Sequence, residues 1–309
     1  MSGKSLGNMT QSIGLGMAPD TKDLAVLIPT RNRSQILRRT LVELKRAGFG
    51  ARSLIVYDDA SEDQDAVSRV VREEWPKASL IRGTERIGQA AGRNRLLNAC
   101  SSELALCLDD DCFPDSGVWG DQYLNADWCG KRWAVVTFQC VRLRDGEMAI
   151  KGSPAQGNVT GFLGGACMMH VPSVLSTGGY RDFFMYGCEE PELALRLRLA
   201  GFCIWQDPLV VVRHNQFDAP DEKRDSREYD YLYARNTVLL YSLNFPLSLG
   251  LILGAARSLR HLLFRRRNWT SSAKGLWDGV VMTFARRQDR RPCTWRQARQ
   301  LTRSQGNAI

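Results

Sequence analysis

Short apolar runs recur along the first half of this chain, and most of them end in a polar turn. Each run is apolar throughout, which is typical of strands buried on both faces of a parallel sheet. Stretches with leucine or valine at helical spacing lie between the runs. Strands that alternate with helices predict a doubly wound, largely parallel α/β sheet. We expect strands at residues 24–28, 53–57, 80–81, 104–108, 133–138 and 209–213. The first helix should run from Ser34, its N-cap, to Gly48, its C′ residue. Further helices are expected at residues 63–74, 88–99, 191–200 and 229–243.

The chain has 309 residues, enough for one large α/β domain with an appendage. We expect a flexible leader at residues 1–22, a main α/β domain at residues 23–228, and a helical, basic extension at residues 229–309. Residues 145–165 are rich in glycine and polar side chains, which predicts a long loop. None of the nine cysteines has C-x-x-C spacing. This argues against a zinc ribbon or a thioredoxin-like motif and favours reduced thiols in the cytosol.

The formal net charge of +9 comes from the C-terminal end of the chain. Thirteen of the 42 Lys and Arg residues, but only two of the 33 Asp and Glu residues, lie from Arg257 onward. Such a basic end could face anionic lipid or nucleic acid, or be a solvated helical face. Nucleic acid is disfavoured, because the chain has no recognisable binding motif and an acidic crevice would repel phosphates unless a metal were bound.

Residues 238–254 form an apolar run that several polar residues and Pro246 interrupt, and the run is short for a bilayer span. Together with the nearby arginines, including those at 265–267, it suits a helix in the membrane interface with basic residues toward anionic headgroups. The alternative is that these helices pack on the main domain and the arginines are solvated.

Three polar turns follow three of the expected strands, and the third contains three consecutive carboxylates. In a doubly wound sheet such strand ends meet at one crevice. Like charges on one turn repel one another, and a hard divalent cation with oxygen ligands relieves that repulsion. A solvated acidic turn and a helix N-cap are the alternatives for single turns, but the three together favour one site. The turns are Pro29-Thr30-Arg31-Asn32, Asp58-Asp59-Ala60-Ser61 and Asp109-Asp110-Asp111.

The order and spacing of these turns and of three later segments resemble the nucleotide-sugar-dependent glycosyltransferases of family 2, which have the GT-A fold. The resemblance covers residues 24–214. Its motifs are the P-T-x-N-R-like turn at residues 29–33, the D-D-x-S turn at residues 58–61, the segment Gly88-Gln89-Ala90-Ala91-Gly92-Arg93-Asn94, the D-x-D motif at residues 109–111, the G-G-A motif at residues 164–166, and Glu189-Glu190-Pro191-Glu192-Leu193 in place of E-D-x-D-L.

The resemblance implies a role for each matching residue. Nucleotide-sugar binding falls to Pro29, Thr30, Arg31, Asp59, Arg93 and Asp110. The implied ligands of a Mn²⁺ or Mg²⁺ ion are Asp109, Asp111 and His214, although a lone histidine at a strand end is also a common structural residue. Gly164, Gly165, Ala166 and Glu189 would lie on the acceptor side. The ion would stabilise the negative charge that builds on the departing nucleoside diphosphate.

Glu190 is the implied catalytic base, and it stands where the family usually has Asp. Family members are inverting enzymes, so one carboxylate would take the proton of the acceptor hydroxyl. With Pro191 at the first helical position, Glu190 is expected at the helix N-cap, where the helix dipole favours its ionised form. The alternative is that Glu189, Glu190 and Glu192 only place favourable charge at a helix N-terminus.

The resemblance therefore predicts an inverting glycosyltransferase that moves a sugar from a nucleotide-diphosphate donor to a hydroxyl of a glycan or lipid-linked acceptor. We expect a role in polysaccharide or glycoconjugate biosynthesis, in the cytoplasm or peripherally on the inner face of the cell membrane. A nucleotidyltransferase is disfavoured, because its Gly-rich loop is replaced by Pro29-Thr30-Arg31-Asn32. The change at Glu190 leaves an inactive nucleotide-sugar-binding scaffold as a further alternative. The sequence does not determine the donor sugar, the base of its nucleotide, the acceptor or the oligomeric state.

Overall fold

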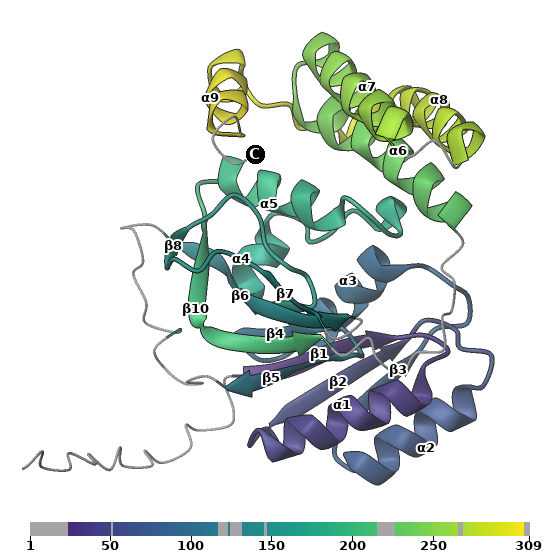
Figure 1. Cartoon of the computed structure of the whole chain (residues 1–309), viewed down its shortest axis with the longest axis vertical. Coiled ribbons are helices and arrows are strands. Elements are labelled where there is room, and N and C mark those ends of the chain that lie inside the picture. Colours follow the sequence, from purple (N-terminus) through teal and green to yellow (C-terminus); the bar gives the residue numbers. More distant parts are fainter. Residues whose placement is uncertain are drawn as a thin grey trace, which may run out of the picture.

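The computed structural model describes residues 24–50, 52–116, 123, 132–144, 147–214, 226–264 and 268–305. The expected leader at residues 1–22 and the arginines at 265–267 lie outside these residues. A mixed α/β architecture with one central sheet is visible in Figure 1, and it confirms the predicted fold class. Along the sheet the strands are β3 (Ser79–Arg82), β2 (Ser53–Asp58), β1 (Leu24–Thr30), β4 (Leu104–Leu108), β9 (Ala166–His170), β6 (Trp133–Arg144), β10 (Cys203–His214) and β5 (Cys112–Ser116).

The first four strands of this order are parallel, as the sequence predicts. The strand β9 then lies antiparallel between β4 and β6. Its register pairs Leu108, the last residue of β4, with Ala166, the first residue of β9. The acidic turn after β4 and the Gly-Gly-Ala segment before β9 are therefore neighbours in space.

Helices cover both faces of the sheet, and alternate residues of β1 point to the two sides. Val26 and Ile28 pack in one core with α1 (Ser34–Arg46) and α2 (Gln64–Glu74). Ala25 and Leu27 pack in the other core with α3 (Gln89–Ala99), α4 (Val171–Ser176) and α5 (Glu189–Leu199). This two-sided burial explains why the runs are apolar at every position.

Three local predictions need correction. Residues 145–165 are not a continuous loop, because β7 (Glu147–Lys151) pairs with β6 and β8 (Gly157–Asn158) pairs with β10. The helix expected from Pro191 begins at Glu189 with Cys188 as its N-cap, so Glu190 lies inside the first turn and is not the N-cap. Proline is accommodated there because the first N–H groups of a helix have no intrahelical acceptor. At α1, Ser34 is the first helical residue and Arg33 is the N-cap.

Four helices follow the sheet domain. Three of them, α6, α7 and α8, pack on one another beyond α5, and α9 lies apart from this group (Figure 1). The helix α6 contacts both α7 and α8 extensively, and Pro246 separates α6 from α7. The predicted boundary after residue 228 lies in the first turn of α6. Among the described residues, no helix combines the length and the apolar character that crossing a bilayer requires. The bounds are α6 Ser226–Asn244, α7 Leu247–Phe264, α8 Trp269–Ala285 and α9 Trp295–Gln305.

Candidate active site

Two buried carboxylates after β4 are tied to the turn after β1. The Thr30 hydroxyl donates to Oδ2 of Asp110 at 2.8 Å. The guanidinium of Arg33 bridges both carboxylates, donating to Oδ1 of Asp110 and to Oδ2 of Asp111, the latter at 2.8 Å. Burial raises the pKa of Asp110 to about 7, although the charge of Arg33 opposes the shift. The expected nucleotide-binding turn and the acidic turn thus form one structural unit.

Asp109 faces the other way, toward α3. Nη2 of Arg93 donates to Oδ1 of Asp109 at 2.6 Å, and Nη1 donates to the carbonyl oxygen of Gly164 at 2.7 Å. Gln89 adds a third hydrogen bond, also to Oδ1 of Asp109, at 2.9 Å. Burial is the largest single influence and lowers the pKa of Arg93, but Asp109, Tyr180 and Glu190 act together to raise this pKa above its ordinary value. Arg93 therefore stays charged beside the acidic turn.

The glycines of the Gly-Gly-Ala segment allow two carboxylates to approach the backbone. A Cβ atom at Gly165 would collide with the carboxylate of Asp109. A Cβ atom at Gly164 would collide with Oε1 of Glu190 and lie 3.1 Å from its Cγ. The turn after β4, the entry to β9 and the start of α5 therefore meet at one place, although Asp109 and Glu189 are 80 positions apart along the chain.

Glu189 and Glu190 lie side by side at the start of α5. Glu189 is only 2% exposed, and within the described part of the chain its Oε2 has no hydrogen-bond partner. Burial, with the neighbouring Glu190 second, raises the pKa of Glu189 well above its ordinary value. Burial also raises the pKa of Glu190, while Arg93 opposes that shift. At the same pH, this pair of glutamates therefore carries less negative charge than two exposed glutamates would.

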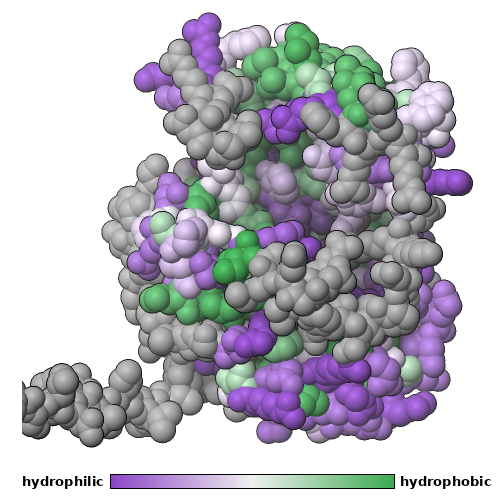
Figure 2. Space-filling view, in the orientation of Figure 1, coloured by the Kyte–Doolittle hydropathy of each residue, from purple (hydrophilic) through white to green (hydrophobic). Residues whose placement is uncertain are grey.

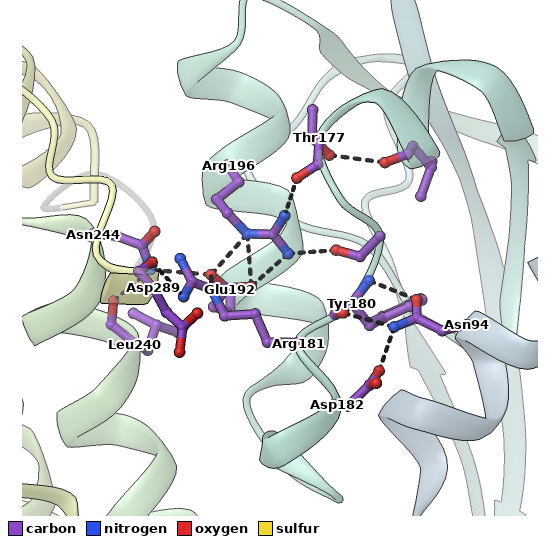
Figure 3. Close-up of polar contacts among 12 residues, drawn as sticks. Asn94, Thr177, Tyr180, Arg181, Asp182, Glu192, Arg196, Leu240, Asn244 and Asp289 are labelled. Atoms are coloured by element: carbon purple, nitrogen blue, oxygen red, sulfur yellow. Dashed lines mark hydrogen bonds and ion pairs between the residues drawn. The ribbon is translucent and has the colours of Figure 1, made fainter. Parts of the chain in front are cut away.

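The third acid of this segment, Glu192, has a structural environment (Figure 3). It is fully buried and accepts hydrogen bonds from Nε of Arg181 at 2.7 Å, from Nη2 of Arg196 at 2.7 Å and from Nδ2 of Asn244 at 3.2 Å. Arg181 also donates to the backbone carbonyl of Asp289 at 2.7 Å. Glu192 therefore joins α5 to the C-terminal helices.

Asp59 organises a loop through backbone contacts. Its Oδ1 accepts from the N–H of Ile87 at 2.8 Å and its Oδ2 from the N–H of Gly88 at 3.0 Å. Gly88 in turn packs against the backbone of Met185 in the loop before α5, where a Cβ atom would lie 2.9 Å from the Met185 Cα. Asp59 is thus connected to the segment that contains Glu190.

The backbone is strained where these turns meet. Asn32 (φ 56°) and Ala60 (φ 54°) have left-handed conformations in the turns after β1 and β2. The Ser61 hydroxyl accepts from the N–H of Asn32 at 2.8 Å, so the two turns are interlocked. Non-glycine residues with positive φ cost free energy and cluster at functional sites. Arg31 contributes a buried Nε with no partner among the described residues.

The donor set for a divalent ion is present. Ligand atoms of Asp109, Asp111, Cys112 and His214 all lie within 4.8 Å of one another. The two carboxylates suit Mn²⁺ or Mg²⁺, which prefer oxygen ligands. Burial raises the pKa of Cys112 well above its ordinary value, and a sulfur ligand is softer than Mn²⁺ and Mg²⁺ prefer. Asp109 and Asp111 are therefore the residues that fit such an ion.

His214 is close to Asp111 but is held by another residue. Its Nε2 lies 3.1 Å from Oδ1 of Asp111, and its Nδ1 accepts from Nε of Arg142 at 2.8 Å. An arginine can only donate, so Nδ1 is unprotonated and the proton of a neutral ring is on Nε2. His214 could ligate a metal through Nε2 only after Arg142 releases Nδ1.

Sequence reasoning brought together most of this cluster but gave no role to Arg33, Gln89 or Arg142. Arg33 and Gln89 lie inside the motifs at residues 29–33 and 88–94, so motif membership already pointed to both residues. Arg142 lies in β6, where nothing in the local pattern indicates a contact with a residue 72 positions away.

Residues 25–156 match the family model described as "Glycosyl transferase family 2". The chain contains a glycosyltransferase family 2 domain. Among curated relatives, the "Pre-mycofactocin glycosyltransferase" of Mycobacterium tuberculosis is 27% identical over an alignment of 216 residues, and the match covers 64% of this chain and 43% of that protein. The match thus spans less than half of the relative's length.

Solved structures share the GT-A fold with this chain. The mannosyltransferase PcManGT from Pyrobaculum calidifontis, in complex with GDP-Man and Mn²⁺, aligns with a TM-score of 0.52 at 16% identity over 94% of this chain and 82% of that one. GalNAc-T7 with UDP, GalNAc and Mn²⁺ aligns with a TM-score of 0.53 at 15% identity over 71% of this chain and 51% of that one. S. aureus TarS 1–349 in complex with UDP-GlcNAc aligns with a TM-score of 0.52 at 15% identity over 80% of this chain and 74% of that one. At these identities the likeness shows the fold.

Proposed function

We propose that this protein is an inverting glycosyltransferase that moves a sugar from a nucleoside-diphosphate donor to an acceptor hydroxyl. One observation supports the proposal above all others. Glu190 and Asp109 lie against consecutive glycines, Gly164 and Gly165, while Arg93 binds both Asp109 and Gly164. A candidate base and a candidate diphosphate site thus share one small region, as a displacement at a sugar carbon requires.

The donor would lie along the turns after β1, β2 and β4. Pro29, Thr30, Arg31 and Asp59 belong to the nucleotide side, and Asp110 fixes Thr30 and Arg33 there. A divalent ion at Asp109 and Asp111 would supply Lewis-acid stabilisation of the charge on the leaving diphosphate. Arg93 is a permanent positive charge beside Asp109 and would attract the same phosphate oxygens.

Glu190 would act as the base. Its carboxylate takes the proton from the acceptor hydroxyl as that oxygen attacks the anomeric carbon, and the bond from this carbon to the diphosphate oxygen breaks. Burial raises the pKa of Glu190 and so makes it a stronger base than an exposed glutamate, while Arg93 keeps part of the ionised form. Glu189, Gly164, Gly165 and Ala166 would line the acceptor side.

For the acceptor we propose a hydroxyl of a glycan or of a lipid-linked molecule, in polysaccharide or glycoconjugate assembly at the cytoplasmic side of a membrane. The apolar, basic helices of the C-terminal region favour an acceptor that is presented at a surface.

A screen of UDP- and GDP-sugars with Mn²⁺ tests the proposal by release of nucleoside diphosphate. Release of pyrophosphate from a nucleoside triphosphate in the presence of a sugar 1-phosphate would instead indicate a nucleotidyltransferase. Glu190→Gln should retain donor binding by calorimetry and lose turnover by about 10²- to 10⁴-fold. Glu73→Gln, an exposed glutamate on α2, is the control and should behave as the wild type. Equal turnover in the wild type and Glu190→Gln would rule out the base role, and donor binding without turnover in every assay would favour the scaffold alternative.

A further inference from the structure

Most of the exposed large apolar side chains belong to the C-terminal helices. Of the ten such residues in the described parts of the chain, eight lie from residue 252 onward. Figure 2 shows hydrophobic residues gathered over α7 and α8. We call this surface the apolar face, and its members are Ile252, Leu259 and Leu263 of α7 and Trp269, Trp277, Val281 and Phe284 of α8. Ile252 and Trp277 are each 66% exposed, so the apolar face is open to solvent along both helices.

The opposite sides of α7 and α8 contain small residues. A Cβ atom at Gly254 would lie 2.8 Å from the Cα of Val238 in α6, and one at Gly275 would collide with the carbonyl oxygen of Tyr231, also in α6. The Ser258 hydroxyl donates to a carbonyl of α6 at 2.9 Å. The buried positions of this kind are Gly250, Gly254 and Ser258 on α7 and Ser272, Gly275, Gly279 and Thr283 on α8.

This distribution is the reverse of that in a helix of a water-soluble bundle. There the large apolar side chains face the core and polar ones face water. Small residues at the contacts between helices, with large apolar ones facing outward, are instead typical of helices whose surroundings are lipid. The helices α7 and α8 bury small residues against α6 and leave the members of the apolar face on the outside, although Leu249, Leu253 and Met282 pack inward.

The charges next to the apolar face are positive. Arg257 and Arg260 on α7, Lys274 on α8 and Arg287 just after α8 are exposed. The two acids in this part of the chain are engaged, since Asp278 accepts from the Tyr231 hydroxyl at 2.8 Å and Asp289 forms an ion pair with Arg286 at 3.7 Å. An apolar surface with a basic fringe is complementary to a bilayer that contains anionic lipid.

We propose that the apolar face docks the protein on an anionic lipid bilayer, with α7 and α8 lying in the interfacial zone. A second copy of the chain is a poorer occupant, because two identical faces would bring their basic fringes together. Trp269 and Trp277 suit the headgroup level, where tryptophan is enriched. Since no described helix is long and apolar enough to cross, the helices lie on the bilayer and do not span it.

The helix α6 would fix the candidate active site relative to this bilayer. Nδ2 of Asn236 donates to the carbonyls of Phe184 and Gly187, both at 2.7 Å. These carbonyls belong to the loop that leads to Glu190. The same helix carries α7 and α8 on its other sides. The further step, that the acceptor is linked to a lipid in that bilayer, rests on the proposed function, whereas the docking itself does not.

Vesicle flotation without donor or acceptor tests the docking. The full chain should float with vesicles of phosphatidylcholine and phosphatidylglycerol and bind at least tenfold less to phosphatidylcholine alone. The double variant Ile252→Glu, Trp277→Glu should lose this binding by at least tenfold. Leu209→Glu is the matched control, because Leu209 is 72% exposed but lies in β10 of the sheet domain. It should float as the wild type does, and nucleotide binding should be retained in both variants if they are folded.

Three outcomes would overturn the proposal. The wild type fails to float with either vesicle, the double variant floats as well as the wild type, or light scattering finds a dimer that the double variant dissociates while vesicles bind nothing. Because flotation needs no turnover, loss of the proposed transferase activity and loss of docking would be detected separately.

Discussion

The carboxylate of Glu190 lies directly against the backbone of Gly164, so close that no side chain fits between them. A Cβ atom at this glycine would collide with Oε1 of Glu190 and stand 3.1 Å from its Cγ. The carbonyl of the same glycine accepts from Arg93, which also holds Asp109. Gly164 is therefore the residue through which the candidate base and the acidic turn are kept at a fixed separation.

Gly164→Ala should displace Glu190 and lower kcat by about 100-fold, because a shift of about 1 Å in a catalytic group has effects of that size. Donor binding, measured by calorimetry, should change less than threefold. Gly161→Ala is the control: a Cβ atom there meets nothing within 4 Å, so the turnover should stay the same. Equal turnover in both variants would mean that Glu190 does not need its present position.

Glu192→Gln should destabilise the protein, because it leaves the largely buried guanidinium groups of Arg181 and Arg196, whose side chains are 11% exposed, without a counter-charge. Removing one partner of a buried ion pair costs about 3–5 kcal/mol, whereas an exposed pair is worth about 1 kcal/mol or less. Urea denaturation should therefore show a much larger loss for Glu192→Gln than for Glu73→Gln, which removes an exposed pair with Arg38. A loss below that of the control would show that this network contributes little.

Glu189→Gln should stabilise the protein at neutral and alkaline pH. Burial raises the folded-state pKa of Glu189 above its ordinary value of 4.5, so the folded state keeps a proton that the unfolded state releases. The stability of the wild type therefore falls as pH rises from about 4.5 through the raised pKa, and the neutral glutamine avoids this loss.

The expected gain is about 1 kcal/mol or more at pH 8 and close to zero near pH 4, measured by thermal unfolding at both values. A gain of equal size at the two pH values would come from packing and not from protonation.

The apolar runs predicted the parallel half of the sheet because burial on both faces leaves a plain signature in β1, β2 and β4. The same reasoning missed β9. Its five residues, Ala166-Cys167-Met168-Met169-His170, are short and are not rich in β-branched side chains, and nothing local indicates an antiparallel strand between two others. The strand β7, which forms a hairpin with β6, was missed for a related reason, since its glycine-rich surroundings predict a loop.

Motif spacing brought the main site residues together, since strand ends in a doubly wound sheet meet at one edge. Spacing could not separate Glu190, beside Gly164, from Glu192, which is buried against arginines that come from elsewhere in the fold. Nor could it show which side of α7 and α8 faces outward, because small and large apolar residues are interspersed along both helices and only packing on α6 decides the buried side.

The assignment of His214 as a metal ligand depends on a competing hydrogen bond. Arg142 donates to Nδ1, which keeps the proton on Nε2, and a metal bound at Nε2 would have to reverse this arrangement. Arg142→Gln replaces the donor with a group whose carbonyl can accept from Nδ1–H and so orient the ring as a ligand. If His214 binds the ion, the affinity for Mn²⁺, measured by electron paramagnetic resonance of free Mn²⁺, should rise roughly tenfold.

The variant also removes a positive charge near Asp111, which would favour a cation by itself. The His214→Ala background separates the two effects. We expect most of the gain from Arg142→Gln to disappear in that background, because the ligand that it releases is no longer there. A gain that persists without His214 comes from charge alone, and it would limit the metal site to Asp109 and Asp111.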